Sequence, residues 1–169
     1  MKAGTKFLII ILITMAILFF FPPKSKAETI DSPHLTWLQD RCAIHNVPME
    51  IALAIAIVES NFTMINSDPN RNGTYDIGIF QLNSDFIEWF EEALWYEAQN
   101  FNVNDPHDNI EMGIIYLKHL YKQTGSWDYA VRAYNTGLHA LAYDPDRSMS
   151  YLVKVINVLN TLELVKNEY

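Results

Sequence analysis

The sequence predicts a mainly α, single-domain protein with at most a short β segment, preceded by an N-terminal signal sequence. Half of the residues are hydrophobic and 13% are aromatic, which is typical of a packed globular domain. From Ile30 onward the apolar residues recur at helical spacing, and no stretch alternates as a half-buried strand would. Because the chain has no internal repeat and no linker, one domain of residues 28–169 is expected.

Residues 1–27 have the features of a secretory signal peptide. Lys2 and Lys6 give a basic start, and a 15-residue apolar run follows from Phe7 to Phe21. Ser25-Lys26-Ala27 then places small residues at a cleavage site. The run is shorter than the ~20 residues of a membrane-spanning helix. The alternative is an uncleaved anchor, in which case this segment is the chain's membrane contact. Either way, the domain is expected to be secreted or extracytoplasmic.

Charge and composition argue against several classes of function. The formal net charge is −8, and no cluster of Lys and Arg is visible that could contact phosphates, so nucleic-acid binding is not expected. The single Cys42 allows no intrachain disulfide and lies on an apolar helical face, which indicates a packed thiol. The histidines lie at no metal-ligand spacing, so no metal site is expected: His34, His45, His107, His119 and His139.

Capping residues and apolar stripes predict the helices in order. Ser32-Pro33 begins the first helix, and Pro48 begins a second that is apolar on every side. The stretch from Ser67 to Tyr75 is a loop, with Asn72-Gly73 as a strong turn signal. Residues 75–82 form either a short extended segment or a distorted turn.

The second half of the chain is helical. Asp85 is the expected N-cap of a helix from Phe86 to about Ala98. Further helices are expected from Pro106 to a stop at Gly125, from Ser126 to a left-handed end at Gly137, and from about Ser150 to Val165.

Glu59 directly follows the apolar run from Ile51 to Val58. Burial disfavours the charged form of a carboxyl group, and the negative end of the helix dipole adds to this effect. Both effects raise the pKa of Glu59, as a general acid near neutral pH requires. The alternative is a structural acid that pairs with Arg132 or Lys118.

Asp76 follows Glu59 by seventeen residues and lies in a polar, turn-rich segment. Two carboxylates in such contrasting surroundings suggest glycosidic chemistry. Asp76 is expected either to act directly on the substrate or to anchor its loop through its own backbone.

Four motifs in order, between Ile51 and Val155, are similar to known enzymes. The first comprises Glu59-Ser60-Asn61-Phe62 and the segment from Asp76 to Ser84, which together resemble the catalytic region of the lysozyme-like superfamily. The downstream half resembles the bacterial soluble lytic transglycosylases, in a helix of the form P-x-x-N-I-x-x-G-x-x-Y-L, in Ala133-Tyr134-Asn135-Thr136-Gly137, and in a closing helix that begins Tyr151-Leu152. The long loop before Asp76 is most similar to the small transglycosylases of secretion, pilus and conjugation machinery. The sequence departs from the commonest form of the transglycosylase motifs at Phe80 and at Phe62-Thr63.

The resemblance implies a lysozyme-like fold and a monomer that cleaves the β-1,4 bond between N-acetylmuramic acid and N-acetylglucosamine in peptidoglycan. It implies Glu59 as general acid and then base, a 1,6-anhydro product and no cofactor. One alternative is a hydrolytic muramidase that uses Glu59 with Asp76. A second is a non-catalytic wall-binding component of an envelope machine. The expected partners are glycan strands and a secretion, pilus or conjugation machine.

Residues within these motifs are the candidates for substrate binding: Ser60, Gln81, Asn83, Tyr134, Asn135 and Tyr151. Asn83 has a helix cap as its alternative role, Asn135 a left-handed helix end, and Tyr151 a place in the core. Tyr134 is expected to orient Glu59 or to bind the sugar. One aromatic cluster is expected mostly in the core, with one or two members in the cleft: Phe86, Trp89, Phe90, Trp95 and Tyr96.

Overall fold

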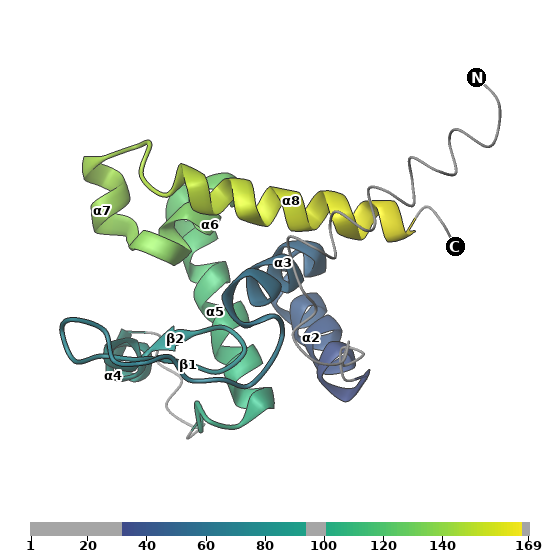
Figure 1. Cartoon of the computed structure of the whole chain (residues 1–169), viewed down its shortest axis with the longest axis horizontal. Coiled ribbons are helices and arrows are strands. Elements are labelled where there is room, and N and C mark those ends of the chain that lie inside the picture. The colour runs from purple at the N-terminus through teal and green to yellow at the C-terminus, as the bar shows by residue number, and fades with distance from the viewer. Residues whose placement is uncertain (1–31, 94–100, 167–169) are drawn as a thin grey trace, which may run out of the picture. The chain divides into compact units, whose positions relative to one another are not determined.

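The computed structural model describes residues 32–93 and 101–166, which are mainly helical (Figure 1). The elements in chain order are α2 (Ser32–His45), α3 (Met49–Ser60), β1 (Asp76–Ile77), β2 (Leu82–Asn83), α4 (Ser84–Ala93), α5 (Pro106–Thr124), α6 (Trp127–Thr136), α7 (Leu138–Tyr143) and α8 (Met149–Lys166). The predicted mainly α class with a short β segment is confirmed. The predicted signal sequence at 1–27, the helix end near Ala98, and the aromatic residues Trp95 and Tyr96 lie outside the described residues. Within the described ranges, no helix combines the length and apolarity that a membrane span needs.

Helix α5 contacts both α2 and α6 and forms the middle of the fold. Asp105 caps its N-terminus, because the carboxylate accepts hydrogen bonds from the backbone N–H groups of His107 at 2.9 Å and Asp108 at 3.1 Å. Gly125 ends the helix in the left-handed conformation, with φ 69°. The predicted start and stop are thus confirmed. Of the apolar stripe expected on this helix, Ile110, Ile114 and Leu117 are buried, whereas Tyr121 is partly buried.

Helix α3 carries Glu59 in its last turn and packs against α2 and α8. Its residues from Ala52 to Ala56 are buried, as the apolar run predicts. The helix ends where Asn61 turns left-handed (φ 55°, ψ 35°), while the N–H of Asn61 still donates to the carbonyl of Ile57 at 2.9 Å. Glu59 therefore lies in the last turn of a helix whose end is fixed by this cap.

Strands β1 and β2 form a short antiparallel hairpin, with Asp76 opposite Asn83 and Ile77 opposite Leu82. Residues 75–82, for which the sequence allowed either an extended segment or a turn, therefore contain strand β1, a turn and the start of strand β2. Gly78 lies in that turn with φ 77°, a conformation that favours glycine.

Buried Asn109 attaches the hairpin to α5. Its amide oxygen accepts a hydrogen bond from the N–H of Phe80 at 2.9 Å, and its amide nitrogen donates to the carbonyls of Ile77 and Val103, both at 3.0 Å. A Cβ at Gly78 would lie 2.4 Å from this amide nitrogen, so glycine is required for the close approach. The amide thus sets the position of the hairpin against the helix.

Helix α4 begins earlier than predicted, and its cap is a different residue. The helix starts at Ser84 rather than Phe86, and Asp85 lies inside its first turn. The side chain of Asn83 accepts a hydrogen bond from the N–H of Asp85 at 3.1 Å and acts as the cap. The prediction was wrong because both residue types favour this position and the sequence alone did not distinguish them.

The connection after α6 also differs from the prediction. Gly137 has φ 80° and ψ 152°, which is not the left-handed helical conformation expected there. The short helix α7 follows immediately and was not predicted. Six residues are too few to show a helical stripe.

Helices α2 and α5 share a partly buried ionic cluster beside Cys42. Glu111 accepts hydrogen bonds from Arg41, including one from Nη2 at 2.6 Å, and contacts His45 Nε2 at 2.7 Å. Cys42 is buried as predicted, and burial together with the charges of Glu50 and Glu111 raises the pKa of its thiol to about 12. The thiol is therefore an unreactive packing group at neutral pH.

Candidate active site

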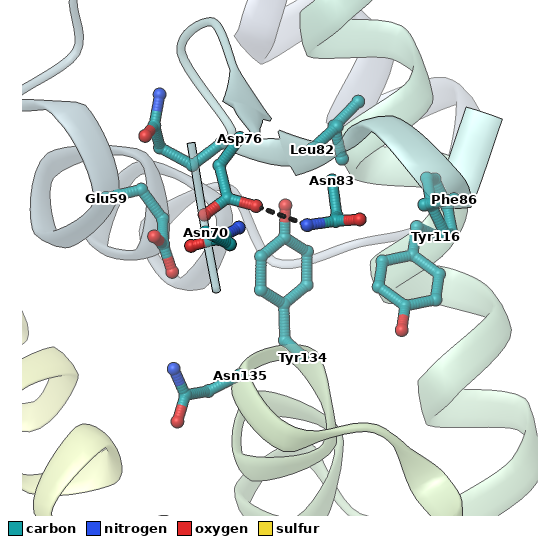
Figure 2. Close-up of a pocket in the computed structure, with 10 residues that line it drawn as sticks. Glu59, Asn70, Asp76, Leu82, Asn83, Phe86, Tyr116, Tyr134 and Asn135 are labelled. Atoms are coloured by element: carbon teal, nitrogen blue, oxygen red, sulfur yellow. Dashed lines mark hydrogen bonds between the residues drawn. The ribbon is translucent and has the colours of Figure 1, made fainter. Parts of the chain in front are cut away.

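A cavity of about 340 Å³ opens between the end of α3, the hairpin and the helices α4, α5 and α6 (Figure 2). Polar groups from distant parts of the chain converge on it, which is typical of a ligand site. Apart from Ser60 and Tyr151, every residue predicted for the site lines this cavity. The lining comprises Glu59, Asn70, Asp76, Gln81, Leu82, Asn83, Phe86, Tyr116, Tyr134 and Asn135.

Glu59 is half-buried at the wall of the cavity, and Tyr151 of α8 donates a hydrogen bond to its Oε1 at 2.5 Å. Burial raises the pKa of Glu59, and the negative charge of Asp76 raises it further. The bond from Tyr151 and the charge of Lys154 lower the pKa of Glu59 in part, and the net direction is upward. The carboxyl group therefore keeps its proton to a higher pH than an ordinary glutamate, as the sequence predicts.

The alternative in which Glu59 pairs with Arg132 or Lys118 is wrong. Arg132 donates to the carbonyl of Pro145, and Lys118 lies 3.4 Å from the carbonyl of Asn46.

Tyr151 supports Glu59 from the side of α8. Its side chain is buried, and burial together with the charge of Glu59 raises its pKa, so the hydroxyl stays protonated and donates. Tyr151 is therefore neither a plain core tyrosine nor part of the cavity lining. It positions the carboxyl group that faces the cavity.

Asp76 lies between Glu59 and Asn83 (Figure 2), and its Oδ1 accepts a hydrogen bond from Asn83 Nδ2 at 2.8 Å. Its backbone N–H donates to Ser67 Oγ at 2.9 Å, so the loop-anchoring role is present as well. The carboxylate nevertheless lines the cavity with Glu59. The position of Asp76 thus fits both roles that the sequence left open.

Gln81 has a left-handed backbone conformation, with φ 46°. Its amide nitrogen donates to the carbonyls of Ile65 and Gly78, both at 2.8 Å. These two bonds use both amide hydrogens, so the amide oxygen is the group of Gln81 that can accept a bond from a ligand.

Tyr134 rises from α6 into the cavity wall (Figure 2), and its hydroxyl donates to the carbonyl of Phe80 at 2.7 Å. The expected role in orienting Glu59 therefore belongs to Tyr151. The ring of Tyr134 lies 5.3 Å from that of Tyr116, measured between centroids, and both rings line the cavity.

Ser60 and Asn135 differ from their predicted roles. Ser60 is buried, and its hydroxyl donates to the carbonyl of Ile79 at 2.7 Å, which ties α3 to the hairpin and leaves it outside the cavity lining. Asn135 lines the cavity from within α6, so it is not a left-handed helix end, and its Oδ1 accepts a bond from Ser148 at 2.8 Å.

Three lining residues were not named as candidates for binding: Asn70, Leu82 and Tyr116. Asn70 belongs to the loop before Asp76, whose sequence resembles that of the small transglycosylases. This resemblance could have identified Asn70 as a candidate. Of the two cluster members whose side chains the structure describes, Phe86 reaches the cavity and Phe90 is buried in the core. Among the residues that the structure describes, no group of three His, Cys, Asp or Glu side chains could hold a metal ion.

Together, the helical fold and a glutamate of raised pKa beside a polar cavity define a lysozyme-like domain of glycosidase type. Comparison with protein families gives a match to the transglycosylase SLT domain over residues 38–155. The chain therefore belongs to the transglycosylase SLT domain family.

Individual relatives are more distant. Invasion protein IagB of Salmonella typhimurium, in strains SL1344 and LT2, is 33% identical over 102 residues, as is IagB of Salmonella typhi. The aligned region covers 60% of this chain and 61% of IagB, so the chain spans less than two thirds of these relatives. The solved structure of an inactive mutant of lytic transglycosylase Slt from Pseudomonas aeruginosa has a TM-score of 0.56 and 18% identity, over 78% of this chain and 22% of that one. This likeness shows a shared fold.

Proposed function

We propose that this chain is a peptidoglycan lytic transglycosylase that cleaves the β-1,4 bond between N-acetylmuramic acid and N-acetylglucosamine, with Glu59 as general acid and base. The observation that carries the proposal is the half-buried carboxyl group of Glu59, which lines the cavity and has a raised pKa. A general acid must hold its proton at the working pH until the substrate binds. Membership of the SLT family and the fold shared with lytic transglycosylase Slt support the same activity.

The two proton transfers of the reaction take place between the substrate and Glu59. The carboxyl group of Glu59 donates its proton to the bridging oxygen, and the bond between that oxygen and C1 of the muramyl residue breaks. The positive charge that develops at C1 is stabilised by the neighbouring N-acetyl group of the substrate. The ionised Glu59 then removes the proton of the muramyl 6-hydroxyl, and the oxygen of that hydroxyl bonds to C1. This step closes the 1,6-anhydro ring, returns the proton to Glu59 and consumes no water.

Tyr151 serves both steps. The hydroxyl holds one carboxyl oxygen of Glu59 at 2.5 Å and leaves the other to reach the substrate. Its bond also stabilises the carboxylate that exists between the two steps. Gln81, Asn70 and Asn135 are the polar lining groups proposed to orient the glycan strand.

The substrate lies outside the cytoplasmic membrane, so the proposed site of action is extracytoplasmic, and the signal sequence at 1–27 remains a prediction. Association with a secretion, pilus or conjugation machine is proposed as well, on the resemblance of the loop before Asp76 to the small transglycosylases of such machines.

The test is the release of soluble muropeptides from purified sacculi. Glu59→Gln removes the ionisable proton and keeps the shape of the side chain, so release should stop while the fold persists. Glu163→Gln makes the same change on exposed surface of α8 and should release as the wild type does. Full activity of Glu59→Gln would overturn the proposal, and a wild type that binds sacculi but releases nothing would favour a wall-binding role.

A hydrolytic muramidase is the second candidate, and the position of Asp76 in the same cavity favours it. In a hydrolase a carboxylate stabilises or attacks C1, and water completes the reaction. The two reactions differ in product mass by one water. Mass spectrometry of the released muropeptides separates them, because an anhydro end is lighter than a hydrolysed end.

A further inference from the structure

Asn83 uses both N–H donors of its side chain, and its amide oxygen accepts a further bond. Its Nδ2 donates to Asp76 Oδ1 at 2.8 Å and to Thr74 Oγ1 at 2.9 Å, while its Oδ1 accepts from the N–H of Asp85 at 3.1 Å. Because the first turn of α4 offers only a donor, the amide oxygen must face the helix and the NH₂ group must face Asp76. No donor of Asn83 remains for a sugar, although the residue lines the cavity.

Thr74 locks the other side of this arrangement. The side chain is 5% exposed, and its hydroxyl donates to Asn72 Oδ1 at 2.9 Å while accepting from Asn70 Nδ2 at 3.1 Å and from Asn83. The hydroxyl hydrogen is therefore committed to Asn72, and its lone pairs to the two amides. Asn83 is held between the loop and the start of α4 and cannot turn away from Asp76.

The two carboxylate oxygens of Asp76 differ in their contacts: Oδ1 accepts the bond from Asn83, and Oδ2 lies outside this network. In the described part of the chain, no hydrogen bond is made to Oδ2, which can therefore meet a ligand in the cavity. After the larger effect of burial, the negative charge of Asp76 contributes to the raised pKa of Glu59. Figure 2 shows Asp76 between Glu59 and Asn83, with the dashed bond to Asn83 at the side away from Glu59.

We infer that Asn83 is a positioning residue, which holds the Asp76 carboxylate in the cavity so that the cationic transition state of the sugar meets a fixed negative charge. The inference rests on the proposed glycosidic function. Cleavage of a glycosidic bond passes through an oxocarbenium-like state, and a charge held in place before the reaction stabilises that state without reorganisation. The cap on α4 supplies the rigidity, because the amide cannot rotate without losing its bond to Asp85.

The variant that tests this inference is Asn83→Ser. Serine still caps α4 by accepting from the N–H of Asp85, but it is too short to donate to Asp76. Asn160→Ser makes the same change at an exposed position of α8 and is the matched control. Asn83→Asp is the second variant, since aspartate also caps a helix but offers Asp76 no donor and adds a like charge.

The readout is a double-mutant cycle with Asp76→Asn, measured as kcat and KM for muropeptide release. Loss of a hydrogen bond to a charged group predicts that Asn83→Ser lowers kcat roughly tenfold to a hundredfold with KM little changed. In the Asp76→Asn background the same change should have almost no further effect, because its target charge is gone. An equal loss in both backgrounds, or no loss of kcat in either, would overturn the inference.

A crystal structure of Asn83→Ser gives a readout that does not depend on activity. The carboxylate of Asp76 should leave its position in the cavity, while α4 still begins at Ser84. An unmoved carboxylate would overturn the inference even if the enzyme lost activity. Failure of the proposed function is distinguished by the Glu59→Gln variant, which tests the acid without touching Asn83.

Discussion

Replacing Tyr151 by phenylalanine removes the hydroxyl that contacts Glu59 and keeps the buried ring. In the wild type, the bond from Tyr151 stabilises the ionised carboxylate. It lowers the pKa of Glu59 in part, whereas burial, the larger effect, raises it. A hydrogen bond to a charged group contributes about 1.5–3 kcal/mol, and a change of ~1.4 kcal/mol corresponds to one pH unit. The pH at which activity falls on the alkaline side should therefore rise by about one to two units.

The sign follows from the role of Glu59 as the acid. Activity requires its protonated form, so activity is lost as pH rises through the pKa of Glu59. Without the bond from Tyr151, burial acts unopposed by that donor and the pKa of Glu59 rises further. At neutral pH kcat should still fall, because the carboxylate formed after the first proton transfer is less stable and less well oriented.

The assay is the rate of muropeptide release from sacculi across a pH series for the wild type and Tyr151→Phe. Tyr143→Phe is the matched control, since Tyr143 is 80% exposed and the change should leave the profile unmoved. If the alkaline limb of Tyr151→Phe stays in place or moves to lower pH, the hydroxyl of Tyr151 does not stabilise the ionised form of Glu59.

Three further predictions concern Asp76, Glu59 and Gly113. Asp76→Asn removes a charge that raises the pKa of Glu59, so the alkaline limb should move to lower pH, opposite to Tyr151→Phe. Glu59→Gln should raise the free energy of unfolding at neutral pH by about 0.5–2 kcal/mol, and this gain should vanish below about pH 4, where the wild-type carboxyl is protonated in both states. Gly113→Ala should destabilise the fold by about 1–3 kcal/mol in urea unfolding, because its Cβ would lie 2.3 Å from the ring of Phe80.

Two of these predictions have a matched control, and each has an outcome that contradicts it. Asp128→Asn changes an exposed acid and should not shift the alkaline limb of the pH profile. Movement of that limb to higher pH in Asp76→Asn would be inconsistent with repulsion between the charges of Asp76 and Glu59. A stability gain of Glu59→Gln that persists in acid would mean that the charge is not its source. Gly125→Ala meets no atom within 4 Å but has φ 69°, so it should cost about 1 kcal/mol from backbone strain alone. Equal costs at both glycines would argue against the clash with Phe80.

Local signals were sufficient for much of the fold. Asp105 and Gly125 delimit α5 because a cap and a left-handed glycine act within one turn of the helix they bound. The apolar run before Glu59 predicted both its helix and its raised pKa, since burial is readable from a run with no polar side. The transition between Asn83 and Asp85 was misjudged because two good caps stood two residues apart.

The arrangement within the site depends on which helices meet. Tyr134 and Tyr151 both stand on helices that reach the site, but one hydroxyl binds the carbonyl of Phe80 and the other binds Glu59. Helical spacing gives the face of each tyrosine and not its partner across the fold. For the same reason Ser60 was expected in the cavity, although its hydroxyl turns back to Ile79.

The protonation of Glu59 can be measured directly by carbon-13 NMR titration of its side-chain carboxyl, assigned by the loss of its signal in Glu59→Gln. We expect a midpoint clearly above the ordinary glutamate value of about 4.3, with the midpoint rising in Tyr151→Phe and falling in Asp76→Asn. A carboxyl group that titrates at or below the ordinary value would contradict the assignment of Glu59 as the acid.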